Sequence, residues 1–155
     1  MSAKDTDLGN LDAGNLVDLY RNGEASPLEA ARASLGRIDK FNDSVNAFVY
    51  VDTDGAEEQA KASARRWGRG EPLSPIDGVP VSLKDLTSCA GMPCREGSAT
   101  TSDELCDFDA PPVCRLREAG AVILGKTNTP EFGWKAVTDN RLFGATSNPW
   151  DTSLT

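Results

Sequence analysis

Apolar residues in the first half of the chain recur at helical spacing. Between residues 11 and 20 they fall largely on one side of a helix, and Gly23 supplies a stop. The stretch SPLE predicts the start of a second helix, because Ser26 can cap it, Pro27 suits its first position and Glu29 completes a capping box. Three- and four-residue spacing then predicts one buried stripe on this helix: Leu28, Ala31, Leu35, Ile38 and Phe41.

Two further elements complete this part of the chain. NAFVYV, residues 46–51, is rich in β-branched and aromatic residues and predicts a strand. A third helix is expected from about Asp54, with Glu57 as its capping partner, to a glycine break at Gly68.

The middle of the chain changes character at a segment rich in proline. GEPLSPIDGVPVSLKDL predicts a loop that leads into a buried strand from Val79 to Leu83. Residues 87–107 then carry Gly, Ser and Thr without any period and predict an irregular loop. Loops of this length are uncommon in compact domains and are usually functional or disordered.

The remaining sequence returns to regular structure. DAPPVCRLREAG predicts a helix with Asp109 as N-cap and Gly120 as its stop, and AVILG predicts a buried strand. TPEFGW predicts a short helix with Thr129 as N-cap and Pro130 at the first position. The alternation of helices and strands predicts an α/β protein whose sheet begins here.

Charge and composition exclude several classes of partner. The net charge is −8 and there is no basic cluster, which argues against nucleic acid. The polar, acidic start lacks the features of a signal peptide, and no apolar run approaches the roughly 18 residues of a membrane span. We therefore expect a cytoplasmic protein that binds neither nucleic acid nor a membrane.

Cysteine and histidine usage restricts the chemistry. Cys89, Cys94, Cys106 and Cys114 have the spacing C-x4-C-x11-C-x7-C, without paired C-x-x-C knuckles. Reduced thiols are expected, with a zinc site or a disulfide as the alternatives, and we predict neither metal nor cofactor. The absence of histidine excludes Ser-His-Asp and Cys-His arrangements within this chain.

GAVILGKT, from Gly120 to Thr127, matches the phosphate-binding pattern G-x-x-x-x-G-K-[ST]. Such a loop needs its first glycine after a strand and a helix starting at the lysine. Here the first glycine closes a helix and the middle residues favour a strand. We therefore interpret Lys126 as a structural or substrate-side residue, with a nucleotide-binding module as the weaker alternative.

Lys84 ends the apolar run GVPVSLKDL. Side chains alternate along a strand, so Ser82 and Lys84 point away from Val79, Val81 and Leu83. We expect Lys84 to be partly desolvated, and burial lowers the pKa of a lysine enough for it to accept a proton. The alternative from this local pattern is that Lys84 pairs with a carboxylate such as Asp85 or reaches to water.

Four segments taken together resemble the amidase signature family: GVPVSLKDL, then GSATT, then DAPPVCRLREAGAVILGKTNTPEFG, and finally FGATSNPWD. The resemblance runs from about Asp77 to Trp150. It implies an α/β fold with a mixed sheet surrounded by helices, of which only the N-terminal part is present. We expect a single incomplete domain over residues 1–155, with a helical shell at 1–75 and the start of the central sheet at 76–155.

The resemblance also implies a chemistry and a site. The family hydrolyses amides with a Ser-cisSer-Lys triad; Lys84 matches its lysine, but its two serines lie in motifs absent from the sequence up to Thr155. The 155-residue chain alone is therefore expected to be inactive. Trp134 matches a position that often lines the substrate pocket, with a core aromatic as the alternative.

The same resemblance gives Gly125–Asn128 as structural support of the active-site wall. The implied partner is a small-molecule amide, and assembly into a homo-oligomer is left open. The rival hypothesis is a non-catalytic binding or scaffold fragment of the same fold.

Overall fold

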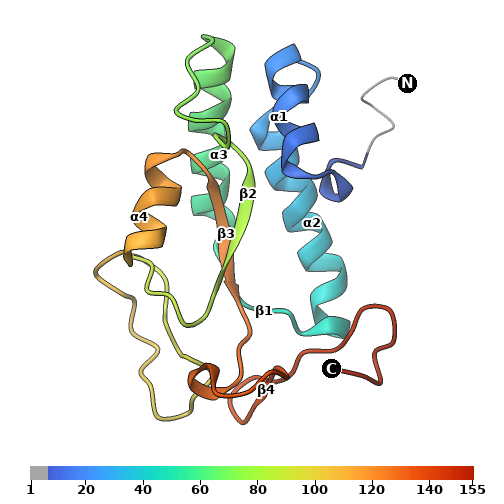
Figure 1. Cartoon of the computed structure of the whole chain (residues 1–155), viewed down its shortest axis with the longest axis vertical. Coiled ribbons are helices and arrows are strands. Elements are labelled where there is room, and N and C mark those ends of the chain that lie inside the picture. Colours follow the sequence, from blue (N-terminus) through green and yellow to red (C-terminus); the bar gives the residue numbers. More distant parts are fainter. Residues whose placement is uncertain (1–6) are drawn as a thin grey trace. The chain divides into compact units, whose positions relative to one another are not determined.

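The computed structural model describes residues 7–155 (Figure 1). Helices and strands alternate along them, which confirms the predicted α/β class. In chain order the main elements are α1 (Ala13–Asn22), α2 (Pro27–Val45), β1 (Phe48–Val51), α3 (Thr53–Gly68), β2 (Pro80–Lys84), α4 (Pro111–Glu118) and β3 (Val122–Thr127). Shorter elements are the 3-10 helices η2 (Leu8–Asn10) and η3 (Glu131–Gly133) and the strands β4 (Asp139–Asn140) and β5 (Gly144–Ala145).

The described residues form two compact units that interleave along the sequence. The first unit comprises residues up to Arg37, Thr53–Val81 and Arg115–Leu124. The second comprises Ile38–Asp52, Ser82–Cys114 and Gly125–Thr155. A single incomplete domain with a boundary near residue 75 stays a prediction.

In the first unit, α1 ends and α2 begins at the predicted capping residues. The N–H of Ser26 donates to the Glu29 carboxylate at 2.8 Å, and the N–H of Glu29 donates to Ser26 Oγ at 3.2 Å. This is the reciprocal capping box. Gly23 ends α1 in the left-handed conformation, with φ of 70°. A small core then forms from Leu16, Val17, Tyr20, Ala30 and Val79.

A buried carboxylate fixes the turn that leads into β2. Asp77 is fully buried, and its two oxygens accept hydrogen bonds from Arg66 at 2.6 and 2.7 Å. The Leu73 N–H donates to the same carboxylate at 2.8 Å. Burial raises the pKa of Asp77, but the bonds from Arg66 and Leu73 outweigh it, so the pKa lies below its usual range.

Several local predictions are wrong. The stripe on α2 is only partly covered, because Leu28, Leu35 and Ile38 are half-buried and Phe41 is exposed. Ala31 is the one stripe residue that is buried as predicted, and the other buried positions of this helix are Pro27 and Ala30.

Three predicted caps also differ from the structure. α3 begins at Thr53, and Glu57 pairs with Arg32 and Lys61 instead of capping the helix. Asp109 accepts a hydrogen bond from the Ala90 N–H, and α4 begins two residues later. Pro130 is the N-cap of η3, with no side-chain cap bond. In the first two cases another partner competes for the polar side chain.

The three main strands form a sheet in the order β1-β3-β2 (Figure 1). Within the second unit β1 runs antiparallel to the end of β3, with Tyr50 opposite Lys126 and Val51 opposite Gly125. A side chain at Gly125 would place its Cβ 2.1 Å from the Tyr50 carbonyl oxygen. The pairing therefore requires glycine at this position.

The segment from residue 87 to residue 107 is irregular, as predicted, apart from an isolated bridge between Pro93 and Leu105. Its chain path is held by backbone bonds such as those that join Gly91 and Met92 to Cys106, each at 3.0 Å. All four cysteines are free thiols, with Cys89 buried.

Candidate functional site

Lys84 is the last residue of β2. Leu83 before it is buried, whereas Ser82 and Lys84 are exposed, so the predicted alternation of side chains is confirmed. The expected desolvation of Lys84 is wrong for the described residues. Its side chain lies at the surface because it points to the face of the strand opposite Leu83.

Asp85, the next residue, turns into the protein. Its side chain is buried, and its Oδ1 lies 3.4 Å from Lys126 Nζ, which is also fully buried. Lys126 Nζ donates a second hydrogen bond to the Pro93 carbonyl at 3.1 Å. The alternative in which Asp85 serves as the partner of Lys84 is therefore wrong, because Asp85 pairs with a lysine 41 positions later in the numbering.

Backbone N–H groups complete the surroundings of Asp85. The Arg95 N–H donates to both carboxylate oxygens, at 3.3 and 3.2 Å. Burial raises the pKa of the Asp85 carboxyl, and the positive charge of Lys126 offsets this only in part. The sequence offered no signal for this pairing beyond the presence of two charges beside apolar runs.

The phosphate-loop interpretation of Gly120–Thr127 is wrong in the structure. Gly120 closes α4 with φ of 83°, and Val122–Thr127 forms the extended strand β3. A strand in a sheet cannot curl its N–H groups around a phosphate. Lys126 is instead a buried structural residue, as its position in the sequence suggested.

Three segments of the second unit meet around Asp85: residues 84–86, 93–98 and 126–134. The Asp85 N–H donates to the Thr127 carbonyl at 3.0 Å, and the Asp85 carbonyl accepts from the Glu96 N–H at 3.0 Å. The Glu96 carbonyl in turn accepts from the Phe132 N–H at 2.8 Å. Both Glu96 and Phe132 have positive φ, of 52° and 51°, which non-glycine residues seldom adopt.

Side chains strengthen the link between the second and third segments. Ser98 is buried, and its Oγ donates to Glu131 Oε1 at 2.6 Å. Close packing joins the first segment to the third, because a Cβ on Gly133 would lie 2.8 Å from Leu86 Cδ1. The strand end that carries Lys84 is thus connected to the segment that carries Trp134.

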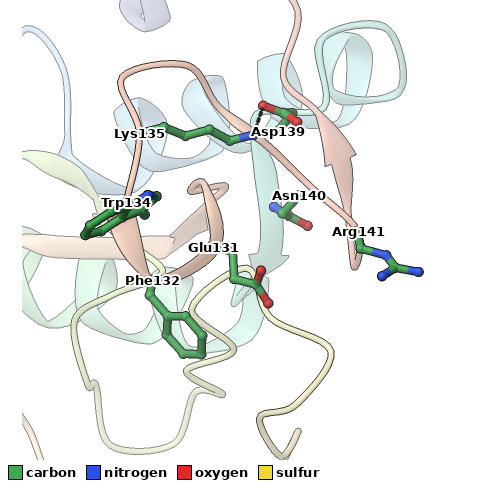
Figure 2. A pocket seen from close by; sticks show the side chains of 7 residues that line it. All are labelled: Glu131, Phe132, Trp134, Lys135, Asp139, Asn140 and Arg141. Carbon is green, nitrogen blue, oxygen red and sulfur yellow. Dashed lines mark ion pairs between the residues drawn. The ribbon is translucent and has the colours of Figure 1, made fainter.

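Trp134 lies on the wall of an open cavity of about 430 Å³. Its side chain is 88% exposed, so the alternative of a core aromatic is wrong for the described residues. Figure 2 shows the lining side chains, among which Lys135 and Asp139 point toward one another and pair at 2.6 Å. The other lining residues are Glu131, Phe132, Asn140 and Arg141. Lys84 is not one of the residues lining this cavity.

Asn140, which lines the cavity, bonds through its side chain to the neighbouring segments. Its amide donates to Asn128 Oδ1 and to the Thr129 carbonyl, both at 2.8 Å. Its side-chain oxygen accepts from the N–H groups of Leu142 and Phe143. The end of the GKTN segment is therefore bonded to a residue that lines the cavity, and its role as support of an active-site wall stays a prediction.

Among residues 7–155, no group of three or more His, Cys, Asp or Glu side chains is placed to hold a metal ion. Within the same range no helix is both long and apolar enough to cross a membrane.

The sequence model of the Amidase family matches residues 29–155. The chain belongs to the amidase family. The match takes in Lys84, the buried Asp85–Lys126 pair and the cavity around Trp134, so the whole site described above lies within the family region.

Two curated relatives illustrate the range of this family. The chain is 44% identical over 148 residues to a component of the glutamyl-tRNA(Gln) amidotransferase of Salinispora tropica, covering 96% of the chain and 30% of the relative. It is 41% identical over 140 residues to an acylamidase of Rhodococcus erythropolis, covering 90% of the chain and 29% of the relative. The chain thus spans about 30% of the length of these relatives.

Solved amidase structures share the fold. The peptide amidase of Stenotrophomonas maltophilia superposes with a TM-score of 0.84 at 30% identity, covering 93% of the chain and 31% of that structure. A 6-aminohexanoate cyclic dimer hydrolase superposes with a TM-score of 0.82 at 33% identity, covering 95% and 29%. The amidase-like architecture predicted from the four sequence segments is confirmed.

Proposed function

We propose that the protein containing this chain hydrolyses carboxylic amides, and that Lys84 is the base of its active site. One observation carries the proposal: the family match runs through Lys84 and continues to Thr155. The amidase family relative from Rhodococcus erythropolis is named an acylamidase, which supports an acyl amide as substrate class.

In this proposal the chain supplies one part of a Ser-cisSer-Lys triad. A serine attacks the amide carbonyl, a second serine relays its proton, and Lys84 accepts that proton and returns it to the amine as the C–N bond breaks, which leaves an acyl ester on the first serine. Water then attacks this ester, which releases the carboxylic acid and restores the serine. Both serines are proposed to lie outside residues 1–155. Residues 1–155 by themselves are then inactive, and no cofactor is needed.

A lysine that accepts a proton at neutral pH must be shielded from water, because burial disfavours its charged form. Lys84 is exposed among the described residues. We therefore propose that polypeptide outside residues 1–155 covers Lys84 in the working enzyme. Trp134, exposed on its cavity wall, is proposed to contact the substrate.

Two other roles compete with a free-standing amidase. The 44% identity to a component of an amidotransferase favours a protein that works within a larger complex. A non-catalytic binding or scaffold fragment of the same fold is the remaining hypothesis. The cytoplasmic location and a homo-oligomer stay predictions.

The test is to purify the complete gene product from its source, weigh it by native and denaturing mass spectrometry, and incubate it with a panel of linear amides and acyl anilides. Release of the carboxylic acid and the amine in equal amounts, by a single polypeptide or its homo-oligomer, is expected. A stable mass that includes unlike polypeptides would favour the amidotransferase role. A mass equal to 155 residues with no amide cleaved would favour the scaffold.

A further inference from the structure

Lys126 of β3 is a buried charged residue. Lys126 is fully buried, and its Nζ has Asp85 Oδ1 at 3.4 Å and the Pro93 carbonyl at 3.1 Å. A buried ion pair is poor evidence for stability, because desolvation can cost more than the attraction returns. Apolar residues of similar volume would often serve stability as well or better. The pair therefore points to a role in fixing geometry.

Asp85 is the point at which three chain segments are joined. Its carboxylate accepts from the Arg95 N–H and lies beside Lys126, and its own N–H and carbonyl bond to Thr127 and Glu96. The irregular loop and β3 are thus bound to a single residue at the end of β2. All of these contacts lie within the second unit.

Lys84 precedes this anchored residue and points the opposite way. Asp85 follows Lys84 directly in a turn, and the two residues share a planar peptide bond, so a fixed Asp85 also restricts the backbone of Lys84 and with it the Cα–Cβ direction of Lys84. Lys84 has a long flexible stem, so the position of its backbone decides which volume its amine can reach. Catalytic groups need placement within about 0.5 Å, and an error of about 1 Å can cost about 100-fold in rate.

We propose that the buried pair of Asp85 and Lys126 is a positioning device for Lys84. In this role the pair does not act on the substrate; it holds Asp85, directly after β2, against β3 and the loop at 93–96, so that the backbone of Lys84 is kept in one position. This inference rests on the proposed function of Lys84. It gives Asp85 and Lys126, two buried charged residues of the second unit, an indirect role in the reaction through the position of Lys84.

The test uses the complete gene product with Asp85→Asn, Lys126→Met and the double variant Asp85→Asn/Lys126→Met. Glu57→Gln, which removes the partly exposed ion pairs of Glu57 with Arg32 and Lys61, is the matched control. Single variants leave one buried charge without its partner and are expected to lower the melting temperature. The double variant removes both charges and is expected to recover most of that loss.

Positioning predicts that kcat of the double variant stays about 10- to 100-fold below the parent while KM changes less than about threefold. A purely structural pair would instead let kcat return with the melting temperature. A double variant that folds with kcat within twofold of the parent overturns the inference, and so does one that does not fold.

Lys84→Ala separates this inference from the proposal on which it rests. If Lys84→Ala keeps activity, the proposed base is wrong and the positioning role falls with it. If Lys84→Ala is inactive while the double variant is fully active, only the positioning role fails.

Discussion

Trp134 can be tested as a substrate contact because its side chain is mostly exposed, so that its removal should disturb the fold little. With 88% of its surface exposed, its removal should change the free energy of unfolding by less than about 0.5 kcal/mol. In the complete gene product, Trp134→Ala is expected to raise KM about tenfold for the amides that it cleaves. Trp150→Ala, also exposed but outside the cavity lining, is the control for Michaelis kinetics. Unchanged kinetics in Trp134→Ala would remove this residue from the site.

Asp77 should make stability depend on acid pH. Its folded-state pKa lies below the usual value of 3.8, so its stabilising charge is present above that value and is lost as pH falls through the lower folded-state pKa. Asp77→Asn is expected to cost about 2–3 kcal/mol at pH 7 and to flatten the loss of stability below about pH 4.

Urea unfolding of the complete gene product and of its Asp77→Asn variant between about pH 2 and pH 7 measures this difference, because the stability lost to protonation appears as a pH-dependent free energy of unfolding. Parallel pH profiles for the parent and Asp77→Asn would show that Asp77 is not responsible. The acidic Glu57 also has a lowered pKa, of about 2, but it is common to both proteins and cancels in the comparison.

At the residue scale the motifs predict Lys84 and Trp134 as site residues, and Trp134 does line a cavity, but the surroundings of Lys84 differ from the expectation. Lys84 was expected to be partly buried and is exposed, whereas the fully buried lysine is Lys126. The Asp85–Lys126 pair could not be predicted, because it depends on how β2 and β3 align. Adjacency in sequence suggests Lys84 as the partner of Asp85, but the Lys84 side chain is exposed and that of Asp85, in the turn after β2, is buried.

Substitution of two glycines by alanine should change the stability of the protein in opposite directions. Gly125→Ala in β3 would bring its Cβ within 2.1 Å of the Tyr50 carbonyl, so the pairing of β1 with β3 must open, at a cost of about 2–4 kcal/mol. Gly36→Ala in α2 meets no atom within 4 Å and should stabilise the protein by about 0.5–1 kcal/mol.

Thermal or urea unfolding of the complete gene product and of its Gly125→Ala and Gly36→Ala variants measures both changes in the free energy of unfolding. Equal stabilities for Gly125→Ala and the parent would contradict the register of β1 against β3. A lower stability of the Gly36→Ala variant would contradict the finding that a Cβ at this position of α2 meets no other atom within 4 Å.

The sequence predicts helices and strands well where residues close in sequence determine their ends. The capping box at Ser26, the stop at Gly23 and the β-branched runs of β1 and β3 each act within a few residues. Caps were wrong where a distant group competes for the side chain, as Arg32 does for Glu57 and the Ala90 N–H does for Asp109. The sheet order follows from contacts far apart in sequence and was not predicted.

On the scale of the whole molecule, exposed apolar side chains predict association. More than half of the surface of several large residues is exposed: Leu73, Leu105, Phe108, Phe132, Trp134, Trp150 and Leu154. The isolated 155-residue chain should therefore self-associate at micromolar concentration and melt with poor cooperativity. Sedimentation velocity and a thermal melt measure this. A monodisperse monomer with one cooperative transition would contradict it and favour an autonomous module.

Lys84 is proposed here as the base of an amide hydrolase. The most direct measurement is the single-turnover rate of amide cleavage by the complete gene product carrying Lys84→Ala, with exposed Lys40→Ala as control and circular dichroism to verify the fold. We expect the rate to fall at least about 1,000-fold in Lys84→Ala and to stay unchanged in Lys40→Ala. A folded Lys84→Ala protein that cleaves amides at the parent rate would contradict it.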